Sequence, residues 1–291
     1  MEENITSKKS IVLAVLFAGL IIGFSVIKSI YNSETFIVFC DVGQGDGAYI
    51  RIHNKIDVLV DAGPDRKILQ CIGKYMPFFD KNIELAFISH PQKDHFGGYE
   101  YILDRYSISL LILNPLNNKT TSYQNLLKKL DQKNIKLKSL YTHDIIDLNE
   151  AKINVLWPTK SYLEKNTYKT TRLNNGFEIK DVFVNLNKFS YVLNFKINNK
   201  SVLFTSDIGK EISNKISSAI DKVYILKVPH HGSKNGATKK FIEKLSPYVS
   251  IISVGKNNSY GHPNKEILDY LNSINSITKR TDLNGDIIIK L

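Results

Sequence analysis

The chain has 291 residues, of which 43% are hydrophobic and 10% aromatic, so it can bury a core and is not an intrinsically disordered chain. Its formal net charge of +11 favours phosphate-rich partners, such as nucleic acids, anionic lipids or anionic wall polymers. A solvated lysine-rich surface explains the same charge, so the charge alone selects no ligand.

An apolar segment, SIVLAVLFAGLIIGFSVIKSI, occupies residues 10–30, and no charged residue occurs from Ile11 to Ile27. This run is at the short end of the lengths that span a membrane as a helix. No small-residue cleavage site ends it, so we predict an uncleaved membrane anchor over residues 1–32, with the helix at about 10–30. A cleaved signal peptide is the competing interpretation.

The lysines around this segment predict its orientation. Lys8 and Lys9 precede the apolar run, and only Lys28 follows it closely. The positive-inside rule therefore favours an inward N-terminus. The remaining domain, residues 35–291, is then expected outside the cytoplasm, on a protein with a single membrane pass.

The first half of the domain alternates between strand and helix patterns. We predict strand, glycine-rich turn and strand over 35–52, then a strand at 55–63, a helix at 65–76, a strand at 84–90, a helix at 99–106, a strand at 108–113 and a helix at 122–134. The polar stretch 141–188 follows, with 157–182 as a long loop.

The second half resumes the same alternation. We predict a hairpin of 190–197 and 200–207 turning at Asn198 and Asn199, then a helix at 209–217, a strand at 222–233, a helix at 237–245, a strand at 248–254, a helix at 264–273 and a strand at 286–291. Two β-rich halves that each alternate with helices predict an α/β fold, an αββα sandwich within one domain.

The only two cysteines are Cys40 and Cys71. Cys40 ends an apolar run and Cys71 lies in a predicted helix, so both are expected to be buried free thiols. No Cys-x-x-Cys pair occurs in the sequence, and any metal ion must therefore be held by histidines and carboxylates.

Metal-ligand residue types follow several of the predicted strands. The stretch FISHPQKDHFGG, residues 87–98, contains His90, Gln92, Asp94 and His95 directly after a buried strand. Four such residues would be costly to place there for packing alone. A single Asp after a strand is usually a turn or a helix cap, so the compact stretch carries the argument.

Three further sites repeat this placement at a strand end. Asp61 lies in VDAG, Asp207 ends LFTSD, and the adjacent His230 and His231 follow the strand in KVPHHGS. Loops at one sheet edge can converge while the sheet holds them in place, so these groups are expected to meet. His262, in SYGHP after the strand SIISV, is a further candidate.

These motifs carry a family resemblance. HPQKDHFGG resembles the His-x-His-x-Asp-His signature of the metallo-β-lactamase fold superfamily. The ordered series FCDVGQGDGAYI, VLVDAG, ISHPQKDHFGG, VLFTSDI, LKVPHHGSKN, SVGKNNSYGHP and RTDLNGDIII resembles the hydrolase domain of ComEC-type DNA-uptake competence proteins, over nearly all of residues 36–291. The resemblance implies two divalent metal ions and hydrolysis of a DNA strand.

The sequence departs from this pattern in three ways. It has one predicted membrane segment, so it is not itself a multi-span channel. Gln92 stands where the superfamily has His and the competence group commonly has Asp, so the first metal site is expected to be weak. His143 is the only histidine between His95 and Asp207, and it does not match the family's middle ligand position.

Roles follow from the resemblance and the residue types. The expected metal ligands are His90, Gln92, Asp94, His95, Asp207 and His230, and the expected catalytic residues are Asp94, His95 and His231. Asp61, Gln44, Asp46, Lys227, Ser233 and His262 are expected to support the ligands or to contact substrate. The choice among His230, His231 and His262 as the later ligand stays open. Zinc or manganese is the expected ion, with magnesium as an alternative.

The sequence therefore predicts a membrane-anchored, extracytoplasmic, metal-dependent phosphodiester hydrolase, most simply a DNA nuclease linked to DNA uptake or degradation. Its expected partners are DNA or another phosphate-rich polymer, the membrane, and DNA-uptake channel proteins. The alternatives are a phosphodiesterase that acts on envelope phosphates and a non-catalytic DNA-binding protein with a degraded first metal site.

Overall fold

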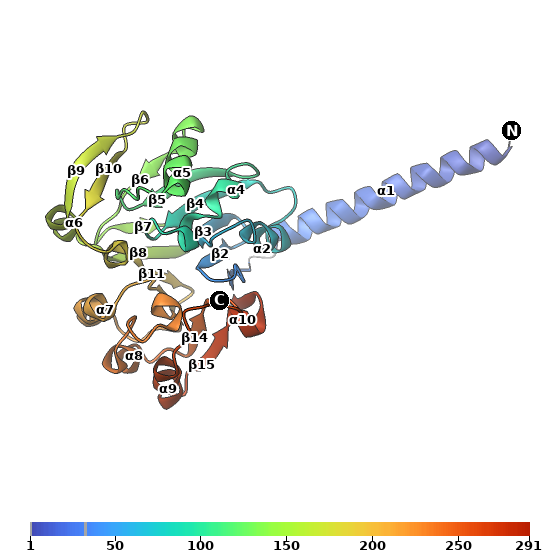
Figure 1. Cartoon of the computed structure of the whole chain (residues 1–291). Helices are drawn as coiled ribbons and strands as arrows, with labels where there is room; N and C mark the ends of the chain where they lie inside the picture. The colour runs from blue at the N-terminus through green and yellow to red at the C-terminus, as the bar shows by residue number, and fades with distance from the viewer. Residues whose placement is uncertain (1, 32–33) are drawn as a thin grey trace.

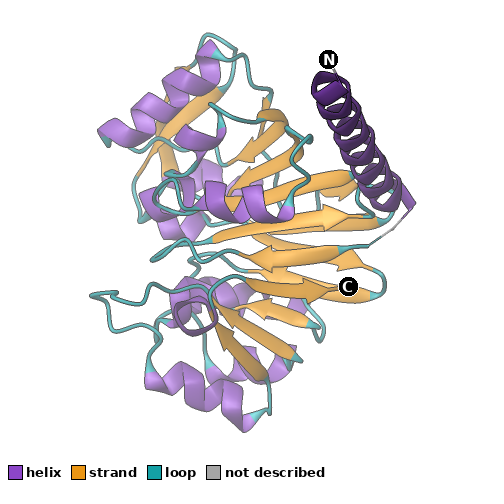
Figure 2. Cartoon of the chain, turned by 90° about the vertical axis from the view of Figure 1, so that its right-hand side faces the viewer, coloured by secondary structure: helices purple, strands orange, loops and turns teal. Residues whose placement is uncertain are grey.

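Two seven-stranded sheets face each other in the computed structural model, which describes residues 2–31 and 34–291, with side chains at 9–24 and 34–291 (Figure 2). The strand order of the first sheet is β16 (Ile287–Lys290), β1 (Phe36–Phe39), β2 (Gly47–Ile52), β3 (Ile56–Ala62), β4 (Asn82–Ile88), β5 (Ser107–Leu113) and β6 (Leu137–Lys138). That of the second is β15 (Ile277–Arg280), β14 (Val249–Ile252), β13 (Ile225–Lys227), β12 (Lys200–Phe204), β11 (Val192–Ile197), β8 (Ala151–Trp157) and β7 (Ile145–Asp147).

Helices cover the outer face of each sheet. Over the first sheet lie α2 (Ile68–Tyr75), α3 (Lys93–Phe96), α4 (Tyr99–Ile102) and α5 (Thr121–Gln132), and over the second lie α7 (Lys210–Ile216), α8 (Lys239–Leu245) and α9 (Lys265–Ser273). The domain also contains the short helical segments η1 (Leu186–Phe189), η2 (Ser217–Ala219), η3 (Pro229–Gly232) and α10 (Thr281–Asn284). The predicted αββα sandwich is confirmed.

Strand alternation divides the core into layers. In β1, Ile37 and Phe39 pack between the two sheets, whereas Val38 packs against the helices over the first sheet. Successive side chains of a strand point to opposite faces, so a strand buried on both faces reads as a continuous apolar run. This is why the central strands were recognisable in the sequence.

The predicted hairpin is also confirmed. β11 and β12 pair antiparallel, from Leu193 opposite Phe204 to Ile197 opposite Lys200. Asn198 and Asn199 form the two-residue turn, with φ angles of 48° and 61°. Such turns need positive φ at both central residues, and asparagine tolerates this conformation better than most residues.

The expectation that the polar stretch 141–188 is irregular, with a loop at 157–182, was wrong. Strands β7 and β8 lie in its first part, and 157–182 is not a loop. It contains α6 (Lys160–Asn166) and the two-stranded sheet of β9 (Thr167–Arg172) and β10 (Glu178–Val182). Most side chains of β9 are exposed, because this hairpin has little core beneath it. Its sequence therefore lacks the apolar alternation that marks a half-buried strand. The helix expected at 99–106 is shorter, ending at Ile102.

The cysteines are joined, so the expectation of free thiols was wrong. Cys40 follows β1 and Cys71 lies in α2, and their Cα atoms are 5.8 Å apart in a disulfide. Both are buried, as the sequence suggested, and the structure places them in the same apolar cluster because α2 brings Cys71 against the end of β1. That packing could not be read from two residues 31 positions apart.

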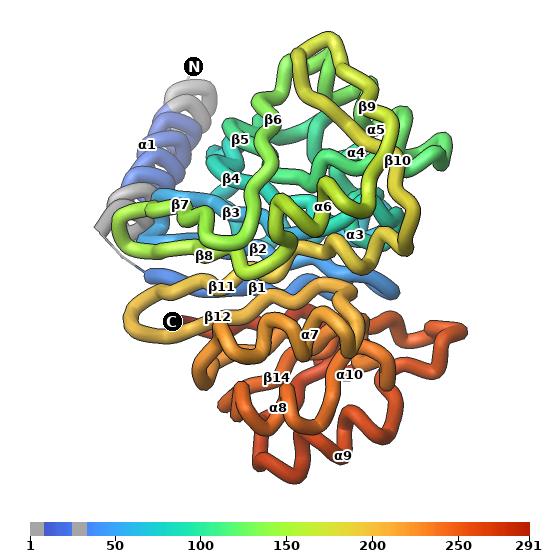
Figure 3. Tube along the Cα trace, turned by 90° about the vertical axis from the view of Figure 1, so that its left-hand side faces the viewer, coloured from blue at the N-terminus to red at the C-terminus, as the bar shows by residue number. Residues whose placement is uncertain are grey.

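Helix α1 (Glu2–Tyr31) covers the predicted anchor and projects away from the sandwich (Figures 1 and 3). Its large apolar side chains from Ile11 to Phe24 are exposed. Among the described residues, no helix combines the length and the apolar character needed to cross a membrane. The domain division at residues 32–35 stays a prediction.

Candidate metal centre

The metal-ligand residue types gather where parallel strands of both sheets end. β3 and β4 run parallel in the first sheet, as do β12 and β13 in the second. Asp61 lies near the end of β3 and His90 just after β4, while Asp207 follows β12 and His231 follows β13. The carboxyl ends of neighbouring parallel strands are the usual location of a site in α/β folds, because loops converge there on a fixed frame.

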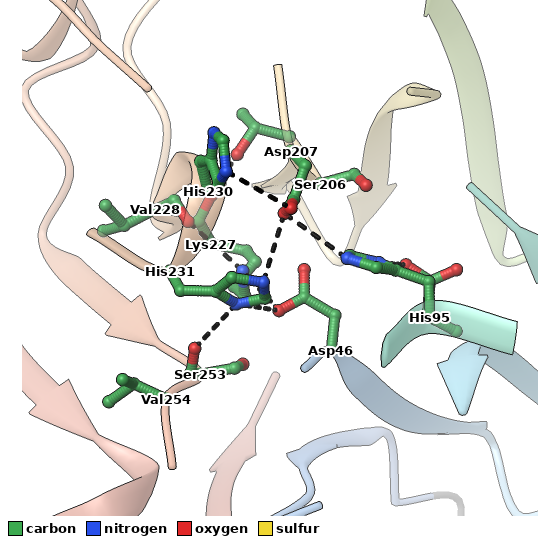
Figure 4. Close-up of polar contacts among 12 residues, drawn as sticks. Asp46, His95, Ser206, Asp207, Lys227, Val228, His230, His231, Ser253 and Val254 are labelled. Atoms are coloured by element: carbon green, nitrogen blue, oxygen red, sulfur yellow. Dashed lines mark hydrogen bonds and ion pairs between the residues drawn. The ribbon is translucent and has the colours of Figure 1, made fainter. Parts of the chain in front are cut away.

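Four ligand atoms converge on one point, which we call the four-atom cluster. Asp207 Oδ1 lies 3.4 Å from both His95 Nε2 and His231 Nε2. Asp94 Oδ2 lies 3.4 Å from His231 Nε2 and 3.7 Å from His95 Nε2. Figure 4 shows the rings of His95 and His231 both directed at the carboxylate of Asp207.

This cluster fits a divalent metal ion. All four atoms lie within 4.8 Å of one another. His95 Nε2, His231 Nε2 and Asp207 Oδ1 are buried, and none has a hydrogen-bond partner among the described residues. Buried polar atoms without partners are costly, and two imidazole nitrogens with two carboxylate oxygens form a donor set suited to zinc or manganese.

Two buried aspartates hold the ligand histidines from behind. Asp61 Oδ2 lies 2.8 Å from His95 Nδ1, and Asp46 Oδ1 lies 3.2 Å from His231 Nδ1. The carbonyl oxygen of Ser253 lies 3.0 Å from the same His231 nitrogen. Partners at Nδ1 fix the ring orientation and direct the lone pair of Nε2 to the metal, so both rings are oriented for ligation.

The electrostatics of the cluster reflect this crowding of charge. Burial lowers the pKa of His95, but the carboxylates of Asp207, Asp61 and Asp94 outweigh it and raise that pKa well above its usual value. Burial lowers the pKa of His231 as well, but the carboxylates of Asp207 and Asp46 outweigh burial and raise that pKa well above its usual value. A proton on each ring balances the carboxylates in the metal-free protein, which is the role a metal cation takes when it binds.

The expected first metal site is less complete. His90 Nε2 is buried without a hydrogen-bond partner, and burial followed by the charge of His95 lowers the pKa of His90 to about 3, so this ring is neutral and able to bind a metal. His230 Nε2 lies 3.8 Å from Asp207 Oδ2. Within the part of the chain whose side chains are described, however, the acidic and histidine atoms of this site do not gather within 4.8 Å as the four-atom cluster does.

Backbone conformation explains how two adjacent histidines reach one site. His230, His231 and Gly232 have φ angles of 51°, 54° and 80°, and Asp61 has a φ of 58°. Left-handed conformations cost non-glycine residues roughly 1–3 kcal/mol each and are concentrated at functional sites. This turn directs His231 into the buried cluster and leaves the His230 side chain 30% exposed.

Two glycines permit the close packing around the ligands. A Cβ on Gly45 would lie 2.2 Å from the carbonyl oxygen of Asp94, and one on Gly98 would lie 2.1 Å from that of Ala62. The first contact docks the DVGQGDG turn against Asp94, and the second docks the start of α4 against β3. The glycine-rich turn is therefore both a tight connection and a wall of the site.

A cavity of about 520 Å³ opens in front of the four-atom cluster. The sequence-predicted residues that line it are Gln44, Gln92, Asp94, Asp207, His230, His231 and His262. Lys227 does not line it: this lysine is buried, and its Nζ lies 2.8 Å from Asp46 Oδ1. Ser233 is also buried and does not line the cavity. The expectation that Lys227 and Ser233 support the ligands or contact substrate stays a prediction.

Solved structures with the same arrangement identify the fold. YhfI from Bacillus subtilis, a metallo-β-lactamase fold protein, matches with a TM-score of 0.57 and 10% identity, over 88% of this chain and 100% of that chain. The fold is therefore that of the metallo-β-lactamases. CmlA, a diiron β-hydroxylase from Streptomyces venezuelae, matches with a TM-score of 0.53 and 13% identity, over 89% of this chain and 54% of its own. A long form RNase Z from yeast matches with a TM-score of 0.50 and 12% identity, over 89% of this chain and 42% of its own.

Two curated proteins resemble the metallo-β-lactamase-fold chain in sequence. ComE operon protein 3 from Bacillus subtilis is 26% identical over 275 residues, which cover 88% of this chain. Recombination protein 2 from Haemophilus influenzae is 23% identical over 254 residues, which cover 85%. Both are of the ComEC type, so the resemblance stated from the motifs is confirmed. The chain spans only 33% and 28% of their lengths. No protein-family model matches the chain.

The fold and the four-atom cluster together support a metal-dependent hydrolase. Among the charged and aromatic residues of the cavity wall, the sequence reasoning missed Asp65, Lys67, Lys93 and Tyr260. Lys93 stands inside the HPQKDHFGG motif, and Tyr260 stands two residues before His262. The motifs could therefore have indicated Lys93 and Tyr260. The position of Lys67 beside the DVGQGDG turn depends on how α2 packs, which the motifs do not show.

Proposed function

We propose that this chain is a metal-dependent phosphodiester hydrolase that cleaves DNA. The observation that carries the proposal is the four-atom cluster, with its unpartnered buried nitrogens and oxygen, at the base of an open cavity. A divalent ion held by Asp94, His95, Asp207 and His231 would supply Lewis acidity and activate water for attack on phosphorus. We expect zinc or manganese, and a second, weaker ion near His90, Gln92 and His230.

The residues of the chain prepare this chemistry in defined ways. Asp61 and Asp46 hold His95 and His231 with each Nε2 directed at Asp207 Oδ1. Lys67 and Lys93 are exposed at its rim, where their charges attract a phosphate. Because Lys227 is already paired with Asp46, the rim lysines are the cations available to an anionic substrate.

DNA is preferred among the phosphodiesters because both curated relatives are of the ComEC type. We further propose that the domain lies outside the cytoplasm, attached to a membrane through α1, where it serves DNA uptake or degradation beside channel proteins. The disulfide between Cys40 and Cys71 favours an oxidising compartment. The exposed apolar residues of α1 favour contact with a lipid phase.

The test uses the metal-free chain and labelled single- and double-stranded DNA, with Mn²⁺, Mg²⁺ or Zn²⁺ added back. Cleavage should depend on metal and should be lost in His95→Ala, while salt-sensitive DNA binding remains. His143→Ala is the matched control, because His143 is exposed and outside the cavity. Binding without cleavage under every metal would support a non-catalytic DNA-binding protein instead. Cleavage of glycerol-phosphate polymers but not of DNA would support an envelope phosphodiesterase.

A further inference from the structure

The rim of the cavity carries two chemically different kinds of side chain. It holds the exposed cations Lys67 and Lys93 and, elsewhere, the exposed aromatic ring of Tyr260 beside His262. The cavity volume of about 520 Å³ is within the range of sites that enclose one small ligand. A phosphate bound near the lysines and the four-atom cluster would therefore leave room for one attached group.

Tyr260 differs from the other exposed aromatic residues in its placement. Its side chain is 68% exposed, although isolated exposed aromatics are common and need no explanation by themselves. Its ring, however, lies nearly parallel to that of His262, with 22° between the planes and 5.8 Å between the centroids. The exposed ring of Tyr260 is thus stacked on His262 in the wall of the cavity that Asp94, Asp207 and His231 also line.

The loop that carries this pair is held in one conformation. Asn258 donates its side-chain amide to the carbonyl oxygens of Gly255 and His262, at 3.0 and 2.9 Å, and its Oδ1 accepts from His262 N at 3.0 Å. The backbone N–H of Gly255 donates to Gln44 Oε1 at 3.1 Å, which ties the loop to the opposite DVGQGDG turn. A surface fixed in advance loses little conformational entropy when a ligand stacks on it.

We propose that Tyr260 and His262 form a stacking platform for a nucleobase of a single-stranded nucleic acid, whose phosphate lies between the rim lysines and the four-atom cluster. The inference rests on the proposed function and adds the strand form of the substrate. Every base has a π-face, so such a platform is tolerant of sequence. In a duplex both faces of a base are already stacked, so an internal base pair cannot use the platform.

The test measures binding by fluorescence anisotropy in the metal-free full-length chain, so that no cleavage occurs. The probes are a labelled ten-residue oligothymidylate and a ten-residue abasic strand with the same phosphates. The wild type should bind oligothymidylate about tenfold or more tightly than the abasic strand, in line with the strength of base–aromatic stacking. Tyr260→Ala should remove that difference by weakening only the oligothymidylate, and Tyr260→Phe should preserve it.

Tyr248→Ala is the matched control. Tyr248 is equally an exposed tyrosine, but it precedes β14 and stacks on Tyr224, at the end of the strand opposite to the site. The Tyr248→Ala variant should bind both probes as tightly as the wild type does. Equal binding of the two probes by the wild type would overturn the platform, as would a parallel loss for both probes in Tyr260→Ala.

The outcomes separate this inference from the proposed function. Base-dependent binding without cleavage under any metal would retain the platform and remove the nuclease. Metal-dependent cleavage with no base-dependent binding would retain the hydrolase and remove the platform. Tighter binding of a glycosylated glycerol-phosphate polymer than of oligothymidylate would mean that Tyr260 stacks on a sugar ring, which would also overturn the nucleobase assignment.

Discussion

Gln92 lines the cavity and lies two residues after His90, whose ring is neutral because its pKa is lowered to about 3. An amide oxygen is neutral, so it binds a divalent ion more weakly than a carboxylate does. We therefore predict that Gln92→Asp raises the metal content of the chain from one ion towards two. Mass spectrometry of the metal content after dialysis against a fixed zinc concentration would measure this change.

Gln70→Asp is the control for that measurement, because Gln70 is exposed on α2 and outside the cavity. It adds the same charge and should leave the metal content unchanged. An unchanged content in Gln92→Asp as well would mean that the side chain does not face the ions.

The raised pKa values of His95 and His231 predict how metal binding depends on pH. Burial opposes the nearby carboxylates at both rings, but the carboxylates prevail, so both rings keep their protons above pH 6.5 in the metal-free protein. A metal ion must displace these protons in order to bind. Its affinity should therefore rise as the pH rises through the raised pKa values of the two histidines, by up to about tenfold per pH unit for each proton displaced. Calorimetry in buffers of different ionisation enthalpy would count the protons that metal binding releases. If no proton were released at pH 7, the assignment of His95 and His231 as protonated metal ligands would be contradicted.

At the scale of elements, the disulfide closes a loop that includes β2 and β3 and the aspartates behind both ligand histidines. Cys40 and Cys71 are 31 positions apart, and Asp46 and Asp61 lie between them. Loop-closure entropy predicts that Cys40→Ala with Cys71→Ala lowers the free energy of unfolding by roughly 3–4 kcal/mol. Urea denaturation would measure the loss, and metal affinity should fall with it because the supporting aspartates become less constrained.

A reducing agent supplies the internal comparison. It should destabilise the wild type by about as much as the double substitution does, and it should leave the double variant unchanged. A wild type that is indifferent to the reducing agent would show that the thiols are not joined in solution.

How far the sequence could predict these elements depended on burial. Central strands such as β12 end in a buried apolar run, so both the strand and Asp207 after it were recognisable. β15 is mostly exposed and carries no such pattern, so it was missed. The same limit applied at the site: the motif indicated a histidine pair, but the choice of His231 depends on three successive positive φ angles, which adjacent residue types do not encode.

At the scale of the whole molecule, α1 is an exposed apolar helix joined to a basic domain. Burying a leucine or phenylalanine side chain contributes roughly 1.5–3 kcal/mol, so a few such residues are enough to attach the chain to a lipid surface. We predict that the full-length chain floats with vesicles of neutral phosphatidylcholine, where the net charge of +11 gives no attraction to the lipid.

Replacing three exposed residues of α1 should abolish this attachment: Leu13→Gln, Phe17→Gln and Leu20→Gln together remove several kcal/mol of apolar burial in lipid. The control is Leu283→Gln, which replaces an equally exposed leucine on the sandwich and should float as the wild type does. Cleavage of DNA in solution should be the same in all of these chains, because no residue of α1 whose side chain is described, 9–24, lines the cavity. Flotation of the triple variant would place the lipid contact on the sandwich itself, and recovery of the wild type free of vesicles would remove the anchoring role from α1.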